Sequence, residues 1–353
     1  LVRLKGTLVF LMGLSAMGFL LNGLTEAGMD PDTPAAVLEN GTCAGQRRVT
    51  ATVGTLKEAS DRAGIKTPAI IVVGKVCALS SQMHWEEDRV LGGRQFLVTR
   101  PRQSSSSLAE RLRDLGAQVI EMPAIRTEPI CPNRRLREAL ETFGTHADQE
   151  WLVFTSPAGA DLFFDQLMEL GMDLRSLLAR GAKVRIAAIG SGTAAALRKR
   201  GLIPDLVPRV YSAAALGETL AETAAEGSRI TVARAEKGSE ELLPPLLKAG
   251  LDVDDIPLYR TLYETHPLLK DRIRELLEQG RIDAVTFTSA STVRGFTGAL
   301  ECADYTGIRA VCIGEQTAAE AAKYGMQIQV SDQASMDAMV RKIVELFGKD
   351  SGQ

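Results

Sequence analysis

The sequence repeats itself, and this repeat constrains the fold more than any other feature. Four blocks occur twice in the same order, about one domain length apart. Two similar lobes leave a cleft between them, where we expect a large small-molecule ligand to bind. The pairs are LVTRPRQSSSSLAERLRDLGAQVIEMPAIRTEP (from 97) with ITVARAEKGSEELLPPLLKAGLDVDDIPLYRTL (from 230), FTSPAGADLFF (from 154) with FTSASTVRGF (from 287), AAIGSGTAAALRKRG (from 187) with VCIGEQTAAEAAKYG (from 311), and, more loosely, VYSAAALGETL (from 210) with QASMDAMVRKI (from 333).

Short apolar segments alternate with helical patterns throughout the repeated region. QFLVT, QVIEM, WLVFT and VRIAAIG are predicted strands of the first copy. The helices expected between them have Ser or Pro at their starts and Gly at their ends. Near-continuous apolar strands alternating with helices predict parallel sheets covered on both faces. With right-handed crossovers, each copy becomes a doubly wound α/β lobe.

The composition is that of a soluble globular protein. The 353 residues are 45% hydrophobic and 24% charged, and the net charge of −3 gives no reason to expect nucleic acid as a partner. The cysteines form no C-x-x-C pair. We therefore expect a reduced, cytoplasmic protein without a zinc site or a disulfide framework. The five cysteines are Cys43, Cys77, Cys131, Cys302 and Cys312.

An apolar run at residues 4–24 follows Arg3 and Lys5 and is similar to a signal peptide. Three glycines and an asparagine interrupt this run, no A-x-A cleavage site follows it, and it is too interrupted for a membrane span. We expect a buried strand followed by a core helix. The first region ends near Trp85, and the polar residues 86–93 are expected to be a linker.

Hydroxyl, glycine and arginine residues stand at the carboxyl ends of the predicted strands, where ligands bind in doubly wound folds. A single Ser or Thr before a helix is an ordinary N-cap, but six such sites on two lobes favour a cradle for a ligand with many carboxylates. Arg102 and Lys237 are further candidate carboxylate partners. The predicted substrate-binding residues are Thr99, Arg100, Thr155, Ser156, Ser191, Thr193, Arg234, Ser289 and Thr317.

The usual catalytic constellations are absent from the sequence. His84, His146 and His266 do not lie at strand ends, so a Ser-His-Asp triad is not expected. There is no Walker A loop, no G-x-G-x-x-G after a strand and no metal-ligand spacing. The chemistry expected here needs neither a cofactor nor a strong base. Tyr259, at a strand end where the two repeats meet, stands out, although the residues alone favour a packed boundary tyrosine.

The ordered set LVTRP, FTSPAG, AAIGSGTAAAL, VYSAAAL, IPLYRT, VTFTSASTV and CIGEQTAAEA, with a final helix at 335–347, resembles the uroporphyrinogen-III synthase family over residues 94–348. FTSAS and GEQTA stand where FTSPS and GPTTA are more usual. The resemblance implies a cofactor-free hydro-lyase of tetrapyrrole (haem, sirohaem, cobalamin) biosynthesis. Linear hydroxymethylbilane would lose water and close to uroporphyrinogen III with its D ring inverted.

The resemblance also implies residue roles and domain limits. The tyrosine matching Tyr259 is the leading candidate for assisting hydroxyl loss, and the positions matching Thr193, Ser289 and Thr317 line the cleft. The implied architecture is two lobes joined by a two-strand hinge. The first lobe would comprise residues 94–126 and 261–348, and the second residues 127–260.

Residues 1–85 resemble the carboxyl-terminal half of uroporphyrinogen-III C-methyltransferase, through GTLVFLMG, AGMDPDTPAAVLENGT, QRRVTAT and TPAIIVVGKV. The resemblance places Met12, Gly41 and Thr42 beside an S-adenosylmethionine site. The amino-terminal half of that family, with its glycine-rich loop, is missing. We therefore expect a partial α/β domain with exposed apolar surface and no methyltransferase activity from this chain alone.

Two alternatives stay open at this point. The first is a bifunctional enzyme whose missing methyltransferase half is a separate chain, associated through residues 1–85. The second is a two-lobed solute-binding protein with the amino-terminal run as its signal, although the composition and the unpaired cysteines weigh against it. The expected partner is a small tetrapyrrole, not nucleic acid or a membrane.

Overall fold

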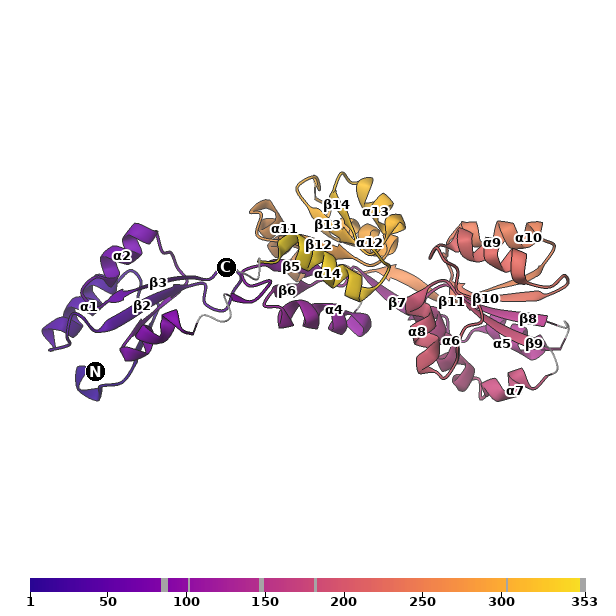
Figure 1. Cartoon of the computed structure of the whole chain (residues 1–353), viewed down its shortest axis with the longest axis horizontal. Coiled ribbons are helices and arrows are strands. Elements are labelled where there is room, and N and C mark those ends of the chain that lie inside the picture. The colour runs from indigo at the N-terminus through magenta and orange to yellow at the C-terminus, as the bar shows by residue number, and fades with distance from the viewer. Residues whose placement is uncertain (84–87, 101, 146–148, 181–182, 303, 350–353) are drawn as a thin grey trace.

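The computed structural model describes residues 1–83, 88–100, 102–145, 149–180, 183–302 and 304–349. Within these ranges the strands form one four-stranded and two five-stranded sheets. The three sheets follow one another along the long axis of the molecule, each with its own helices (Figure 1). The mixed α/β fold with parallel sheets predicted from the repeats is confirmed.

The four-stranded sheet belongs to an amino-terminal module, residues 1–83. Its order is β1-β4-β2-β3, and every neighbouring pair is antiparallel. Helices α1 and α2 cover one face, where Met17, Leu56 and Ile71 are fully buried. The elements are η1 (Val2–Leu4), β1 (Leu8–Leu11), α1 (Met17–Glu26), β2 (Pro34–Glu39), β3 (Arg47–Thr52), α2 (Leu56–Ala63), β4 (Ala69–Val73) and η2 (Lys75–Ser81).

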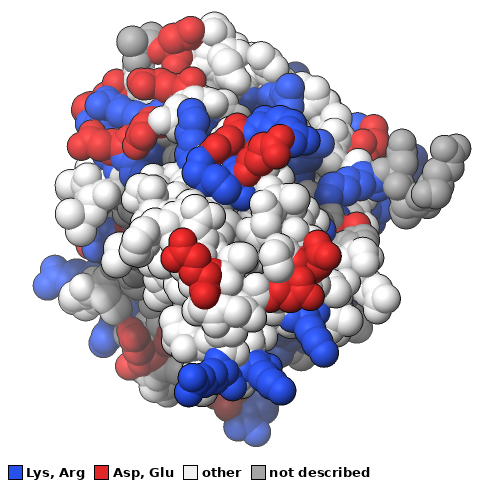
Figure 2. All heavy atoms as spheres, turned by 90° about the vertical axis from the view of Figure 1, so that its left-hand side faces the viewer, with Lys and Arg blue, Asp and Glu red and all other residues white. Residues whose placement is uncertain are grey.

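Strand β1 lies at the edge of this sheet, so the predicted buried strand at the amino terminus was wrong. Val9 and Leu11 are 55% and 70% exposed, because alternate side chains of β1 point away from the face that α1 and α2 cover, whereas Leu8 and Phe10 pack against the core cluster. The following Met12 is 91% exposed. Phe19, on the outer side of α1, is 82% exposed. Figure 2 views the molecule from this end and shows a broad area without charged residues. No helix of the described residues is long and apolar enough to cross a membrane.

The second sheet has the order β14-β13-β12-β5-β6 and is parallel throughout. Both of its faces are covered, because Leu97 of β5 packs in one core cluster while Phe96 and Val98 pack in another. We call this body the first lobe. Its elements are β5 (Gln95–Val98), α4 (Arg102–Asp114), β6 (Gln118–Glu121), α11 (Pro267–Glu278), β12 (Ala284–Phe287), α12 (Ala290–Leu300), β13 (Arg309–Cys312), α13 (Glu315–Ala322), β14 (Gln327–Val330) and α14 (Met336–Phe347).

The third sheet, of the second lobe, has the order β7-β11-β10-β8-β9. Strands β11, β10, β8 and β9 are parallel, and their alternate residues enter two core clusters, with Phe154 in one and Trp151 in the other. The elements are β7 (Ile125–Pro129), α5 (Arg134–Thr142), β8 (Gln149–Phe154), α6 (Pro157–Glu169), α7 (Leu174–Leu178), β9 (Lys183–Ala188), α8 (Ser191–Lys199), α9 (Ala213–Thr223), β10 (Arg229–Ala235), η3 (Glu240–Leu242), α10 (Leu243–Lys248) and β11 (Asp252–Tyr263).

A two-stranded antiparallel ladder links the two lobes (Figure 1). Residues 125–129 of β7 pair with residues 259–263 of β11, whose first half belongs to the parallel part of the sheet. The chain enters β7 just after the carboxyl end of β6, and β11 runs into the ladder at its own carboxyl end. Since parallel strands share one carboxyl edge, the carboxyl edges of both sheets lie on the sides from which the ladder leaves.

The described part of the predicted linker, residues 88–93, packs on the first lobe. Leu91 is fully buried in one of its core clusters, and its backbone N–H donates to the Leu115 carbonyl at 2.8 Å. The amino-terminal module also touches this lobe, because the Ala44 N–H donates to the side-chain oxygen of Gln118 at 2.8 Å. The module therefore contacts the first lobe directly through its β2–β3 loop.

Candidate active site

Tyr259 and Ser156 meet at the carboxyl edge of the second sheet. Tyr259 is the point at which β11 leaves β10 and joins the ladder, and Ser156 is the N-cap of α6, directly after β8. Their hydroxyl oxygens are 2.9 Å apart, and Ser156 Oγ also accepts from the Gly159 N–H at 2.9 Å. A Cβ on Gly159 would lie 3.0 Å from Ser156 Oγ, so glycine keeps this junction open.

The environment of Tyr259 keeps its phenol protonated. The side chain is 7% exposed, and this burial raises the pKa of Tyr259 above its usual value of 10, although the Ser156 hydrogen bond lowers it in part. Ser156 Oγ accepts from the Gly159 N–H and keeps its own proton, so the serine can donate that proton to the Tyr259 oxygen. The phenol proton is then free to point at a ligand. The pair can therefore supply a weak acid.

Four of the predicted hydroxyl residues are either helix caps or unpartnered groups. Ser156 and Ser289 are N-caps, and Ser289 Oγ accepts from the Thr292 N–H at 3.3 Å. Helices α8 and α13 begin instead after Gly190 and Gly314, without a side-chain cap. The third residues of these two helices, Thr193 and Thr317, are buried, and their hydroxyls make no hydrogen bond within the described residues.

Thr99, Thr155 and Ser191 occupy three different settings at the two carboxyl edges. The Thr99 hydroxyl is fully buried and donates to the Thr286 carbonyl at 2.7 Å, which ties β5 to β12. Thr155 follows β8 and is half-buried, whereas Ser191, the first residue of α8, is exposed. Only Thr155 and Ser191 of these three therefore present surface to a ligand at the second sheet.

The two predicted arginines differ in their partners. Arg234 is 7% exposed, and its Nε and Nη2 each donate to Asp255 at 2.8 Å while Nη1 donates to the Ser239 carbonyl at 2.6 Å. Arg100 is partly buried, contacts Met336 Sδ at 2.8 Å and has no carboxylate partner in the described chain. Burial lowers the pKa of Arg100, yet a guanidinium stays charged at neutral pH. Arg100 is therefore the arginine available to an anion.

The remaining charged candidates contribute less. Lys237 is exposed in the loop after β10, and the side chain of Arg102 lies outside the described residues, as do His84 and His146. His266 precedes α11, and its Nε2 lies 2.6 Å from the Pro123 carbonyl oxygen, where the ladder leaves the first lobe.

Sequence reasoning missed Tyr211, which lies at the same edge as Tyr259. Its ring packs on the backbone of Gly190, where a Cβ would come within 2.9 Å of the Tyr211 Cγ atom. The side chain is nevertheless 43% exposed. The block VYSAAAL contained this aromatic residue directly before the N-cap Ser212, and that position is the signal by which it could have been found.

The predicted S-adenosylmethionine residues lie at one edge of the amino-terminal sheet. Met12 follows β1, and Gly41 and Thr42 follow β2, which runs in the same direction. All three are exposed, and Met12 and Thr42 have positive φ angles of 54° and 66°. Residues this open to solvent do not enclose a cofactor by themselves, so no chemical step is derived from them.

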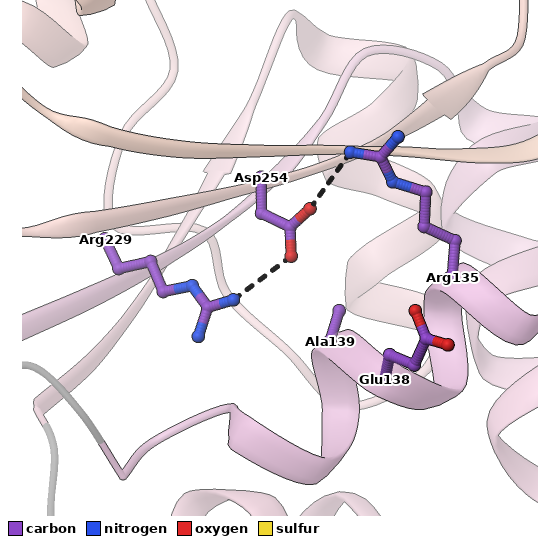
Figure 3. A pocket seen from close by; sticks show the side chains of 5 residues that line it. All are labelled: Arg135, Glu138, Ala139, Arg229 and Asp254. Atoms are coloured by element: carbon purple, nitrogen blue, oxygen red, sulfur yellow. Dashed lines mark hydrogen bonds and ion pairs between the residues drawn. The ribbon is translucent and has the colours of Figure 1, made fainter.

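One polar pocket lies away from this region. Arg135, Glu138, Ala139, Arg229 and Asp254 line a cavity of about 440 Å³ in the second lobe (Figure 3). Asp254 pairs there with both arginines, at 3.1 Å to Arg229 and 3.6 Å to Arg135. Arg229 and Asp254 stand at the amino ends of β10 and β11, so this pocket is at the opposite edge of the sheet from Tyr259.

The comparison with known families agrees with this arrangement. Residues 106–341, which contain the whole Tyr259 and Thr317 region, match the family described as "Uroporphyrinogen-III synthase HemD". The chain belongs to the uroporphyrinogen-III synthase family. Synthase function and a place in tetrapyrrole biosynthesis are thereby supported, and neither the bifunctional nor the solute-binding alternative is favoured.

Individual relatives extend the match beyond the synthase region. The chain is 39% identical over 348 residues to the "Porphyrin biosynthesis protein HemD" of Ruminiclostridium josui, which covers 99% of this chain and 67% of that protein. It is 33% identical over 204 residues to the "Uroporphyrinogen-III C-methyltransferase" of Bacillus subtilis, which covers 58% of this chain and 40% of that protein. The amino-terminal part matches fragments of such methyltransferase relatives, consistent with a fusion.

A solved structure shows the same fold for the synthase lobes. A crystal structure of mutant uroporphyrinogen III synthase from Thermus thermophilus aligns with a TM-score of 0.51 at 21% identity and covers 71% of this chain and 98% of that one. At this identity the likeness concerns the fold alone. The two-lobed architecture of the synthase family is therefore present in this chain.

Proposed function

We propose that this synthase closes hydroxymethylbilane at the carboxyl edges of its two sheets, with Tyr259 as the acid that assists loss of the terminal hydroxyl. The observation that carries the proposal is the buried Tyr259–Ser156 hydroxyl pair, whose oxygens are 2.9 Å apart. Burial raises the pKa of Tyr259, so the phenol holds its proton at neutral pH and can offer it to the leaving hydroxyl as a hydrogen-bond donor.

The proposed reaction balances without an added reagent. The terminal C–O bond breaks with its electron pair on oxygen, which takes the Tyr259 proton and leaves as water. The pyrrole nitrogen stabilises the cation that remains. The D ring then attacks this cation through its substituted carbon and forms a spiro intermediate. The older bond from that carbon to the methylene bridge of ring C breaks, and the cation left on the bridge is attacked by the free α carbon of the D ring. The proton lost from this carbon restores the aromatic ring, and it also restores the phenol. Because no strong nucleophile is required, we propose that the reaction needs no cofactor.

The carboxylates of the bilane would be held by Arg100 and by the N-termini of α8 and α13. Arg100 carries a charge without a carboxylate partner among the described residues, which favours a bidentate contact with a ligand carboxylate. The two helices present uncapped N–H groups beside the unpartnered hydroxyls of Thr193 and Thr317. Thr155, Ser191, Ser289 and Arg234 remain proposed substrate contacts, and Arg234 would have to share its Asp255 pair.

Orientation would decide which isomer forms. Unassisted closure gives the symmetric type I product, so the enzyme must hold the D ring until it attacks through the substituted carbon. We propose that contacts from both lobes fix the chain across the β7–β11 ladder. The proposed domain limits are 94–126 with 261–348 for the first lobe and 127–260 for the second.

The test is a product analysis. The purified chain is mixed with freshly generated hydroxymethylbilane, and the oxidised products are separated as type I and type III isomers. We expect type III to dominate. Type I alone, from protein shown to be folded by circular dichroism, would reject the proposed function.

For the amino-terminal module we propose no independent methyltransferase activity. Met12, Gly41 and Thr42 are open to solvent, and exposed backbone on one sheet edge is a poor enclosure for an adenosyl group. Incubating the purified 353-residue chain with labelled S-adenosylmethionine and uroporphyrinogen III should transfer no label.

A further inference from the structure

We infer that Tyr211 is a substrate-binding residue of the synthase, a shelf on which one pyrrole ring of the bilane stacks. The inference rests on the proposed function and adds to it a residue that the sequence analysis had not selected. It starts from the contact between the Tyr211 ring and the backbone of Gly190.

Position 190 needs a glycine because of the Tyr211 ring beside it, and not because of its own backbone conformation. Gly190 has φ −173° and ψ −178°, an extended conformation that any residue adopts. A Cβ there would lie 2.9 Å from Tyr211 Cγ, 3.1 Å from Cδ2 and 3.2 Å from Cβ, which is closer than carbon atoms pack. The missing side chain therefore lets the Tyr211 side chain pack directly against the backbone of Gly190.

The position of the ring is fixed from its own side as well. Ser212, the next residue, caps α9 by accepting from the Ala215 N–H at 3.1 Å, and its own N–H donates to the Val210 carbonyl at 2.9 Å. The Tyr211 hydroxyl makes no hydrogen bond within the described part of the chain. With 43% of the side chain exposed, the ring offers its surface, held by packing and a tight turn, to a ligand.

The neighbours of Tyr211 connect it to the acid. Gly190 precedes α8, whose uncapped N-terminus carries the exposed residues Ser191 and Gly192. A Cβ on Gly192 would lie 3.7 Å from the Pro157 side chain. Pro157 directly follows Ser156, and the Ser156 hydroxyl contacts the Tyr259 hydroxyl. Strands β9 and β11 stand three strand spacings apart, about 14 Å. The shelf and Tyr259 would therefore contact different parts of one extended ligand.

The chemistry of a pyrrole unit matches this arrangement. Its aromatic ring can stack on a tyrosine face, and its carboxylate side chains can reach the N–H groups of the neighbouring α8 terminus. Stacking of this kind uses the ring and not the phenolic hydroxyl. Tyr211 would thus hold one ring of the bilane while Tyr259 acts elsewhere on it.

The experiment measures KM and kcat with hydroxymethylbilane for a small set of variants. Tyr211→Ala and Tyr211→Leu should raise KM about three- to tenfold with kcat nearly unchanged, because uniform binding is lost. Tyr211→Phe should behave as wild type. Gly190→Ala should reproduce Tyr211→Ala by displacing the ring, and the double variant Gly190→Ala/Tyr211→Ala should be no worse than either single one. Ile203→Ala, at a 76% exposed apolar residue of the same lobe, is the control.

Three outcomes would overturn the inference. A wild-type KM in Tyr211→Ala would show that the Tyr211 side chain does not bind the substrate. A wild-type KM in Tyr211→Leu would show that binding there does not depend on aromatic stacking. Additive effects in the double variant would mean that Gly190 acts without the Tyr211 ring. These results are separate from a failure of the proposed function, in which the wild-type protein itself would form type I product alone.

Discussion

Single residues at the carboxyl edges have the same chemistry but different partners. Tyr259 is buried against Ser156 while Tyr211 is open, and Arg234 is engaged by Asp255 while Arg100 has no carboxylate. A buried, paired side chain acts mainly on stability or on the pKa of its neighbour, and an unpaired charge is available to a ligand.

Tyr259→Phe should lower kcat about tenfold or more, since a positioned acid is lost. Stability should change by only about 1 kcal/mol, the value of one hydrogen bond. The pKa of Tyr259 is raised above 10, so the wild-type rate should hold until the pH exceeds that raised value and then fall as the phenol ionises. The phenylalanine variant should lack this fall. An unchanged kcat would make Tyr259 a packing residue only.

Arg100→Gln should mainly weaken substrate binding, whereas Arg234→Gln should mainly lower the stability of the protein. Without Arg100 the KM for the bilane should rise severalfold while the free energy of unfolding changes little, because its partner in the described chain is the Met336 sulfur, a weak acceptor. Without Arg234 the free energy of unfolding should fall by about 1–3 kcal/mol, since Asp255 and the Ser239 carbonyl lose their donors. Urea titration and steady-state kinetics on both variants would show the contrast, and equal destabilisation would refute it.

At the scale of elements, close packing between helices and the linking strands fixes the first lobe to the ladder. Helix α12 packs closely against the residues just before β7. A Cβ on Gly295 of this helix would lie 2.2 Å from the Ala124 carbonyl oxygen, so only glycine fits there. The same helix ties to β11 through Arg294, whose Nε donates to the Tyr263 hydroxyl at 3.2 Å. Both ladder strands are therefore held at their first-lobe ends.

Gly295→Ala should destabilise the protein by about 1–3 kcal/mol, because the added methyl group forces α12 away from Ala124. Gly298→Ala is the matched control. It lies on the same helix, has open space around its Cβ position and should gain up to about 1 kcal/mol from helix propensity. Thermal unfolding monitored by circular dichroism compares the two, and similar melting temperatures would contradict the close contact.

At the scale of the whole molecule, the amino-terminal module is attached differently from the synthase lobes. The lobes share the β7–β11 ladder, whereas the module touches the first lobe through its β2–β3 loop, by the Ala44–Gln118 hydrogen bond. The module also carries exposed apolar residues at β1 and α1, with Phe19 as the largest of them. Synthase chemistry and the module's surface should therefore be separable.

A shortened chain of residues 86–353 should keep the synthase rate within about twofold of the full chain, because Leu91 and its core cluster remain. It should also self-associate less, since the exposed apolar surface of the module is removed. Isomer analysis measures the first effect and light scattering the second. Loss of type III product from a folded, shortened chain would show that the module takes part in the synthase reaction.

Patterns in the amino-acid sequence were sufficient to predict the two-lobed α/β architecture and the family. Strand periodicity, helix caps and the internal repeat are local or recurring patterns, so they can be read without coordinates. The same patterns selected Tyr259 but placed it at a strand end, whereas the structure has it inside β11, at the end of the part that pairs with β10. They did not predict the antiparallel edge strand β7 or the exposure of β1, because a strand's neighbours depend on chain paths that local composition does not encode.

Contacts between distant parts of the chain set which residues at the carboxyl edges are free and which are engaged. Ser156 and Tyr259 are 103 positions apart in the chain, and Arg234 and Arg100 look alike in sequence. Gly190 could be read as a helix start, but its absent Cβ has meaning only with the Tyr211 ring above it. Folding brings together the neighbours that raise the pKa of Tyr259, leave Arg100 without a carboxylate and leave the Tyr211 ring accessible. These properties distinguish a ligand site from an ordinary sheet edge.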